Sequence, residues 1–398
     1  MGNQWLSGEV SQIVSRRILW TSSFGCFVIY ACVATSIGPV LSPLSKDFAL
    51  TPSSLGITLG VQTLGGLMAI LGGWISDKGS RLFVSATSMM LLGAASLVLA
   101  VSWNPLVVAA SLFLMSMAAS FIESSMNAFI SNLYPERRGL SVNLFHIAWN
   151  VGSTIGPSLA AFLIVTTGNW RNAYLFPLPV LFSVSVLMVL FSRSVTHVPS
   201  AGARPRNPAS VSLGLLVKFL PVAMIAFFYV AVEMGLSTWL AYILENLGSA
   251  ALEAGLATGL FWGLMGVGRL VWAPIVDRTG YVKPLIAASG LALICMVSAS
   301  LPLPLGLKML LWASSGLFLA PMFPTLIAWV VSLAPELGGS LSGLVFTLAT
   351  IGLFFSNSLV GMVAATFSVE IAQYVFVFFA VAMLVNILAV HLSERQGS

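Results

Sequence analysis

The sequence predicts an all-α membrane protein whose 12 transmembrane helices form two pseudo-symmetric bundles of six helices. Three observations support this fold class. Hydrophobic residues make up 58% of the 398 residues, charged residues only 7%, and the mean hydropathy is +0.99, whereas soluble domains carry about 25% charged residues. The apolar residues form 12 runs of about 20 residues, the length that a helix needs to cross a bilayer. The last six runs repeat features of the first six at one constant spacing.

Charged or turn-forming residues separate the 12 runs, so each run is predicted to be one spanning helix. The first six lie at about 18–44, 55–76, 82–103, 106–133, 140–166 and 171–192. The last six lie at about 219–244, 253–276, 282–303, 307–333, 340–367 and 370–392. The first run has no cleavage site of small residues, so we expect it to remain in the protein.

The basic residues predict the orientation of these spans. With the N-terminus inside, 13 of the 17 Lys and Arg residues fall in cytoplasmic segments. Lys46, Arg171 and Lys308 fall outside, and Arg269 lies within span eight. By the positive-inside rule, both termini are therefore expected in the cytoplasm. The net charge of +5 does not indicate nucleic acid as a partner, because the basic residues lie in the short gaps between apolar runs.

The chain repeats itself at a spacing of 200 residues. The aligned segments are NLYPERRG (132–139) with SLAPELGG (332–339), GGWISDKGSR (72–81) with WAPIVDRTGY (272–281), and WNVGS (149–153) with ATIGL (349–353). We therefore predict an N-terminal six-helix bundle at 1–192, a cytoplasmic linker at 193–218 and a C-terminal six-helix bundle at 219–398. Proteins built from such parallel repeats bind their substrate between the halves, near the membrane midplane.

Two equivalent cytoplasmic loops carry an aspartate followed by basic residues. The positive-inside rule explains the basic residues of such a turn, but it does not explain the acid. Asp77 and Asp277 occupy the same place in the two halves, which suggests a fixed charge contact between helix ends.

The first of these loops resembles the loop between spans two and three of the major facilitator superfamily. The match consists of Gly73, Asp77, Lys78 and Arg81, with Ser80 where the family has Gly; the second copy contributes Asp277 and Arg278. The resemblance covers essentially the whole chain and implies alternating access. It also implies that these residues form a conformational latch that holds and releases the halves without touching substrate.

Polar residues lie deep inside several spans and form the candidate site. Glu123 and Asn127 share one face of span four, and Asn143, His146 and Asn150 share one face of span five. At about 1.5 Å per residue, Glu123 and Asn150 each lie about 15 Å from the cytoplasmic end, so the two faces are expected to be level. An ionised side chain at this depth costs at least about 2.5 kcal/mol, so it is expected to face a cavity or a partner.

Span seven and its neighbours add further candidates. Tyr229, Glu233 and Trp239 lie in span seven, Tyr30 in span one and Trp262 in span eight. Two alternatives stay open for Glu233, which either contacts substrate or pairs with Arg269. The amides and His146 are also compatible with simple hydrogen bonding between helices, and Glu123 with a neutral acid that only bonds Asn150.

The segments FIESSMNAFISNLYPERRG and VNLFHIAWNVGSTIGP resemble the fucose permease branch of this superfamily, whose members are bacterial proton-coupled sugar symporters. The resemblance implies that Glu123 is the protonatable group at the sugar site. It implies a location in the bacterial inner membrane. It also implies substrate contacts by Asn127, Asn143, His146 and Asn150. The acid that fucose permease carries in span one is absent here, so fucose itself is not implied.

Three functions remain open. The first is proton-coupled symport of a small neutral polar solute such as a sugar, since burial favours the neutral form of a carboxyl group and lets Glu123 bind and release a proton. The second is drug/proton antiport, indicated by Gly152, Gly156 and Pro157 in span five. The third is a receptor or scaffold on the same fold. We expect a monomer in the lipid bilayer that uses protons and no cofactor. The sequence shows no nucleophile–base set, no phosphate-binding loop and no metal-ligand spacing, so it does not indicate an enzyme.

Overall fold

The computed structural model describes residues 2–134, 138–194, 213–334 and 337–397. These residues are helical apart from short connections, and they contain 12 helical segments that are long and apolar enough to cross a membrane. The all-helical fold and the number of spans predicted from the sequence are confirmed. The span limits agree with the predicted limits to within a few residues.

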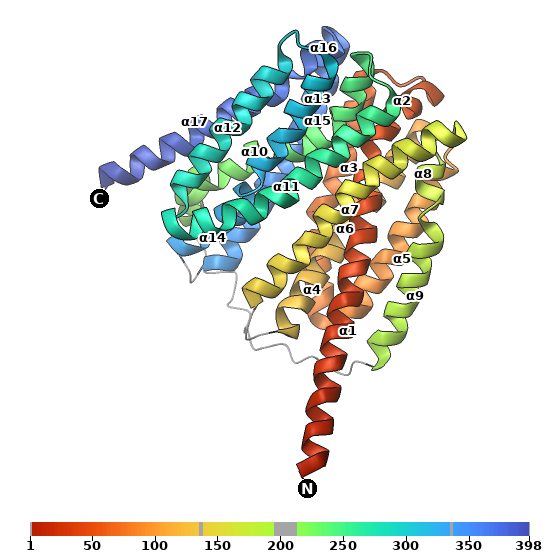
Figure 1. Ribbon diagram of the computed structural model, residues 1–398, viewed down its shortest axis with the longest axis vertical. Coiled ribbons are helices and arrows are strands. Elements are labelled where there is room, and N and C mark those ends of the chain that lie inside the picture. Colours follow the sequence, from red (N-terminus) through yellow and green to blue (C-terminus); the bar gives the residue numbers. More distant parts are fainter. Residues whose placement is uncertain (1, 135–137, 195–212, 335–336, 398) are drawn as a thin grey trace.

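Within the described residues, the first half contains nine α-helices and one 3-10 helix (Figure 1). They are α1 (Gly2–Thr35), α2 (Ile37–Asp47), α3 (Pro52–Leu64), η1 (Gly65–Met68), α4 (Ala69–Lys78), α5 (Arg81–Ala100), α6 (Pro105–Leu133), α7 (Arg138–Thr167), α8 (Asn172–Leu175) and α9 (Leu178–Ser194). Three spans of this half are therefore built from more than one helical segment. The predicted linker lies mostly in 195–212, outside the described residues.

The described part of the second half follows the same plan with eight α-helices. They are α10 (Leu213–Asn246), α11 (Ala251–Thr279), α12 (Val282–Ser300), α13 (Leu305–Leu319), α14 (Met322–Leu333), α15 (Gly338–Thr366), α16 (Val369–Ala372) and α17 (Tyr374–Gly397). Spans ten and twelve are each interrupted once. The sequence analysis predicted continuous helices and did not predict these interruptions.

Side-chain caps define where several spans begin. The Asn104 side chain accepts a hydrogen bond from the Val107 amide at 2.9 Å, and Pro105 follows it as the first helical residue. Both features stabilise a helix start, because the first amides of a helix have no backbone partner and proline has no amide to leave unpaired. In the latch loop, Ser80 caps α5 by accepting from the Phe83 amide at 3.4 Å. This cap gives Ser80 a local role at the position where the resembling family has Gly.

The two halves repeat the same close helix approach. Gly152 of α7 lies against the backbone carbonyl of Val28 in α1, and Gly352 of α15 lies against the carbonyl of Phe227 in α10. A Cβ atom at either glycine would collide with that carbonyl. The glycines are 200 residues apart and their partners 199, so the repeat seen in the sequence is also a repeat in packing.

The halves meet along two related seams. We call the side of the molecule with the connections at 79–80 and 280–281 the terminal side, and the side with the connections at 48–51 and 247–250 the opposite side. The first seam lies between α3 and α15, where a Cβ at Gly56 of α3 would lie 3.0 Å from the Cα of Gly361 in α15. The other seam lies between α7 and α11, where Gly255 of α11 packs on Ala161 of α7.

Both of these contacts lie on the opposite side of the molecule. In Figure 1 the two bundles converge at that side and separate toward the terminal side, where the ends of α4 and α14 lie apart. The structure therefore has its opposite side closed by small residues. The positive-inside rule assigns the terminal side to the cytoplasm.

Candidate functional site

Glu123 of α6 is held by a tyrosine from another helix of the same half. The Tyr30 hydroxyl in α1 donates a hydrogen bond to Glu123 Oε1 at 3.0 Å. Tyr30 is only 3% exposed, whereas Glu123 is half-buried. The expected partner, Asn150, is not hydrogen-bonded to Glu123. Asn150 instead lies against Gly266 of α11 in the other half, and the equal depth of Glu123 and Asn150 stays a prediction.

An aromatic cluster connects this pair to the second half. The rings of Tyr30 and Trp149 lie 5.3 Å apart, and those of Trp149 and Trp262 lie 6.0 Å apart. Trp149 thus spans the seam from α7 to α11. The sequence analysis missed Trp149 as a site residue, although its position next to Asn150 on a polar helix was a usable signal. Trp262 is fixed from its other edge, because its Nε1 donates to Ser237 Oγ at 2.7 Å.

Asn150 and Arg269 lie on opposite sides of the seam between α7 and α11, about one helical turn apart along it. Asn150 is 3% exposed, and a Cβ added to Gly266 would lie 3.3 Å from its Cβ. One helical turn further, Arg269 Nη1 approaches the backbone carbonyl of His146 at 3.5 Å, which is a weak contact by hydrogen-bond standards. The side-chain nitrogen and oxygen of Asn150 and the Nε of Arg269 are buried without a partner.

Tyr229 and Glu233 of α10 complete this region. Both are buried, and both lie within electrostatic range of Arg269. No Arg269 nitrogen comes within 4.0 Å of a Glu233 oxygen, since the ion pairs formed by these described residues are found elsewhere. The Tyr229 hydroxyl has no hydrogen-bond partner of good geometry, although its position one turn from Glu233 places the two groups close together. The Arg269–Glu233 pairing considered from the sequence is thus an electrostatic proximity without a direct bond.

Trp239 belongs to a different network. Its Nε1 donates to Asn357 Oδ1 at 3.1 Å, and Asn357 Nδ2 donates to Thr63 Oγ1 at 3.4 Å. This chain of bonds runs from α10 through α15 to α3, so it crosses the seam between α3 and α15. Asn357 was not identified from the sequence, although an amide in the middle of an apolar span was a signal of the same kind as Asn150. Trp239 has no exposed surface in this arrangement, so its predicted contact with substrate remains a prediction.

Three further predicted contacts have a partial structural description. Asn127 lies on α6, one turn from Glu123, and its Oδ1 is buried without a partner. Asn143 lies in α7, but its side chain is outside the described residues. His146 packs with its ring 5.9 Å from that of Phe27. Within the described ranges, His, Cys, Asp and Glu form no group of three that could hold a metal ion.

The predicted latch residues lie on the terminal side and interact within one half. Asp77 pairs with Arg81 at 3.3 Å, and Arg81 also donates to the Ala128 carbonyl at 3.4 Å. Lys78 stacks over the ring of Trp74 at 3.7 Å. These contacts join α4, α5 and α6. Gly73 lies earlier in α4, and Asp277 and Arg278 are exposed at the end of α11. In this arrangement the first loop makes no ion pair to the described residues of the second half.

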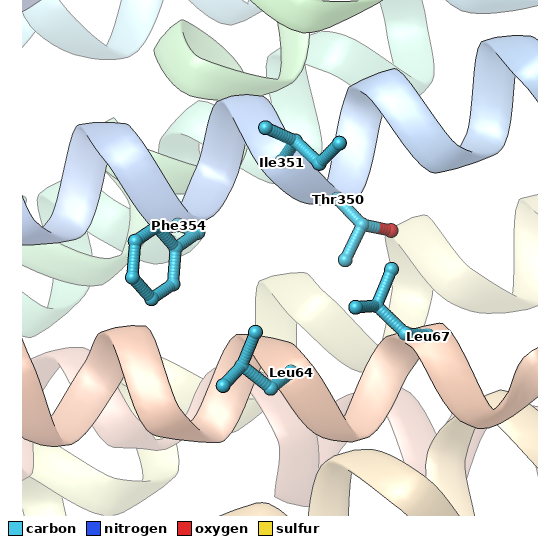
Figure 2. Close-up of a pocket in the computed structure, with 5 residues that line it drawn as sticks. All are labelled: Leu64, Leu67, Thr350, Ile351 and Phe354. Atoms are coloured by element: carbon cyan, nitrogen blue, oxygen red, sulfur yellow. The ribbon is translucent and has the colours of Figure 1, made fainter.

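The seam between α3 and α15 contains a small apolar pocket near the middle of spans two and eleven (Figure 2). Its volume is about 110 Å³, and it is lined by Leu64, Leu67, Thr350, Ile351 and Phe354. Thr350 and Gly66 are the counterparts of Asn150 and Gly266 at the 200-residue spacing, and the two pairs make the same contact. This apolar pocket is therefore the structural equivalent of the polar region around Asn150 and Arg269.

The repeat does not extend to the polar groups themselves. At the 200-residue spacing, Glu123 corresponds to Phe323, Glu233 to Val33 and Arg269 to Ala69. The contact itself is repeated in part: Tyr30 meets Glu123 in the first half, and Tyr229 stacks on Phe323 with ring centres 6.1 Å apart in the second half. The backbone plan is thus shared, while the charges occur once.

Comparisons with known proteins agree with this architecture. The Major Facilitator Superfamily family pattern matches residues 23–357, and again residues 222–397. Solved structures with the same fold include a bacterial homologue of the human lysosomal transporter Spinster, with a TM-score of 0.78, 14% identity and coverage of 94% of this chain and 96% of that chain. They also include a D-xylose–proton symporter, with a TM-score of 0.75, 16% identity and coverage of 94% and 97%.

Relatives of known sequence are more similar. The fosmidomycin resistance protein of Escherichia coli (strain K12) is 27% identical over 371 residues, which cover 89% of this chain and 87% of the relative. The gentisate transporter of Corynebacterium glutamicum is 26% identical over 278 residues, which cover 65% of this chain and 61% of the relative. None of these matches singles out the fucose permease branch. The chain belongs to the Major Facilitator Superfamily and is an integral membrane secondary transporter rather than an enzyme.

Proposed function

We propose that this protein is a proton-coupled transporter of a small polar solute, and that Glu123 takes up and releases the coupling proton. The observation that carries the proposal is the Glu123–Tyr30 pair, in which a half-buried carboxyl group within span four has a hydroxyl donor at 3.0 Å and forms no ion pair with any described residue. An ionised carboxylate without a cation is costly at this depth, whereas a neutral acid is not. The position therefore favours a group that changes its protonation state.

The packing supports a transport cycle by alternating access. Small residues close the opposite side, and the halves separate toward the terminal side. To release a solute on the opposite side, the contacts of Gly56 with Gly361 and of Gly255 with Ala161 must open. In the same step the terminal ends must approach, which would bring Asp77 and Arg81 toward the second half. The latch role of this loop is part of the proposal.

Two modes of transport, uptake and export, are compatible with this proposal. The resemblance in spans four and five favours uptake of a solute such as a sugar together with a proton. The similarity to a fosmidomycin resistance protein over 89% of the chain favours the second candidate, in which a drug-like compound is exported in exchange for protons. In both candidates Glu123 is the proton-binding group, so the chemistry of the site is the same.

The proposal is tested with purified protein in vesicles that contain a pH-sensitive dye. Sugars and cationic dyes are added to the outside one at a time, without an imposed pH gradient. We expect at least one solute to change the internal pH, toward acid for symport inward and toward alkaline for antiport. Vesicles without protein are the control. Solute accumulation that neither changes the internal pH nor responds to a protonophore would contradict proton coupling.

A further inference from the structure

We infer that Arg269, Asn150 and Tyr229 form a docking site for an oxyanion of the transported solute, either a carboxylate or a phosphate-like group. This inference rests on the proposed transport function and defines the class of solute. It replaces the uncharged solute expected from the sequence with one that carries a negative charge.

The first argument is the set of buried donors that lack acceptors. Arg269 Nε, the Asn150 amide nitrogen and the Tyr229 hydroxyl are all buried and unpaired. Tyr229 is 1% exposed and Asn150 is 3% exposed. Leaving a buried donor unsatisfied costs about 1–3 kcal/mol, and more for a charged group. Arg269 and Asn150 lie on the α7–α11 seam, and Tyr229 of α10 lies within electrostatic range of Arg269 and beside Glu233. Together they indicate a place that is completed by a ligand rich in acceptor oxygens.

The second argument compares the two seams of the same molecule. The counterparts of Asn150 and Arg269 are Thr350 and Ala69, and Gly66 approaches Thr350 Cγ2 at 3.6 Å in the way that Gly266 approaches Asn150. The seam between α3 and α15 packs around an apolar pocket of about 110 Å³ (Figure 2). Helix packing at this position therefore requires neither an amide nor a guanidinium group.

The third argument concerns charge. Arg269 is the cation of this region, and its guanidinium group makes no direct ion pair with Glu233. A guanidinium group binds carboxylates and phosphates through two parallel hydrogen bonds, which are stronger than neutral ones. An uncharged sugar would satisfy hydroxyl and amide groups but would leave Arg269 without a direct ion pair, since Glu233 lies only within electrostatic range. A solute with an oxyanion satisfies both.

The neighbouring rings suggest how the rest of such a solute is held. Trp149 and Trp262 lie edge to face across the same seam, with an interplanar angle of 78°. They are neighbours of Asn150 along α7 and of Gly266 along α11, respectively. An organic body attached to the oxyanion would therefore contact aromatic surface, which favours organic anions over inorganic ones.

The test measures thermal unfolding of the purified full-length protein with matched anionic and neutral compounds. The pairs are benzoate with benzyl alcohol, phenylphosphonate with benzyl alcohol, and glucuronate with glucose. A ligand that binds the folded state raises the unfolding temperature in a saturable way. We expect at least one anion to do so more strongly than its neutral partner. In Arg269→Gln its apparent affinity should fall at least about tenfold, equivalent to 1.4 kcal/mol.

Two further variants control for indirect effects. Arg269→Lys keeps the charge but loses the two-pronged geometry, so an intermediate affinity is expected. Lys283→Gln removes an exposed cation at the start of α12 and should leave anion binding unchanged. Unfolding curves without ligand show whether each variant is folded. If no anion stabilises the wild-type protein more than it stabilises Arg269→Gln and Arg269→Lys, the docking site is refuted.

The outcomes separate this inference from the proposed function. Binding of an anion through Arg269 without any proton movement would leave the docking site intact and contradict proton coupling. Proton-driven accumulation of a neutral sugar that Arg269→Gln does not impair would support proton coupling and overturn the docking site.

Discussion

Gly152 shows how strongly a single residue controls the packing of two helices. Its Cα lies so close to the Val28 carbonyl that a methyl group has no room, whereas a Cβ at Gly25 would have no atom within 4 Å. We expect Gly152→Ala to destabilise the protein by roughly 1–3 kcal/mol, the usual cost of overpacking. Gly25→Ala should change stability little or raise it through helix propensity. Thermal unfolding in detergent measures both, and equal unfolding temperatures would contradict the packing argument.

The residues of the candidate site could be predicted better than their partners. Glu123, Asn150 and Arg269 were identifiable because polar groups in apolar spans require an explanation. Their contacts were not, since the rotation of each helix about its axis depends on the packing of the whole bundle. The hydrogen bond of Tyr30 to Glu123, 93 positions away, was not predicted, and the expected contact of Tyr30 with substrate stays a prediction.

At the scale of helices, the seam between α3 and α15 is held by one amide. Asn357 accepts from Trp239 and donates to Thr63. Asn357→Leu removes this cross-half bond and leaves the Trp239 N–H unpaired. A net hydrogen bond is worth about 1 kcal/mol, so the population with an open opposite side should rise about fivefold.

A cysteine at Ser358 measures this opening, because Ser358 Oγ faces Gly60 across the seam. In a background without Cys26, Cys32 and Cys295, we expect a membrane-impermeant maleimide to label Ser358→Cys about fivefold faster when Asn357 is Leu. Asn386→Leu is the matched control, since Asn386 bonds the Pro221 carbonyl within the second half. An unchanged labelling rate would mean that Asn357 does not hold the seam.

The loop between α4 and α5 carries the latch prediction. The Asp77 side chain is 70% exposed and pairs with Arg81 inside the first half. Such an exposed pair contributes about 0–1 kcal/mol to stability, so Asp77→Asn should unfold at nearly the wild-type temperature. If the loop engages the second half when the terminal side closes, transport should slow while equilibrium solute binding stays nearly intact. Loss of binding in proportion to transport would contradict a latch.

Helix limits were predictable where composition sets them, and interruptions were not. The apolar runs end at charges and caps, so the spans agree with the sequence analysis to within a few residues. The break at Ser36 was missed. There the Ser36 hydroxyl donates to the Cys32 carbonyl at 2.7 Å and also approaches the Gly156 carbonyl at 3.3 Å. This arrangement needs α7 as a neighbour, which the local sequence does not reveal.

At the scale of the whole molecule, one backbone plan serves two different purposes. The repeated glycine contacts give both halves the same packing and give the two seams the same geometry. The charges break this symmetry, because Glu123, Glu233 and Arg269 have apolar counterparts at the 200-residue spacing. The repeat is consistent with two halves that rock about a common site, and the charges that break the symmetry are the groups to which we assign proton binding and solute recognition in our proposals.

The central claim is that Glu123 carries the coupling proton, and Glu123→Gln in reconstituted vesicles tests it most directly. Glutamine imitates the protonated acid in size and can still accept the hydrogen bond of Tyr30, but it cannot titrate. The measurement compares counterflow exchange with accumulation driven by a pH gradient, using a solute that the wild-type protein transports. We predict that exchange persists while uphill accumulation is lost. Undiminished uphill accumulation by Glu123→Gln would contradict the account.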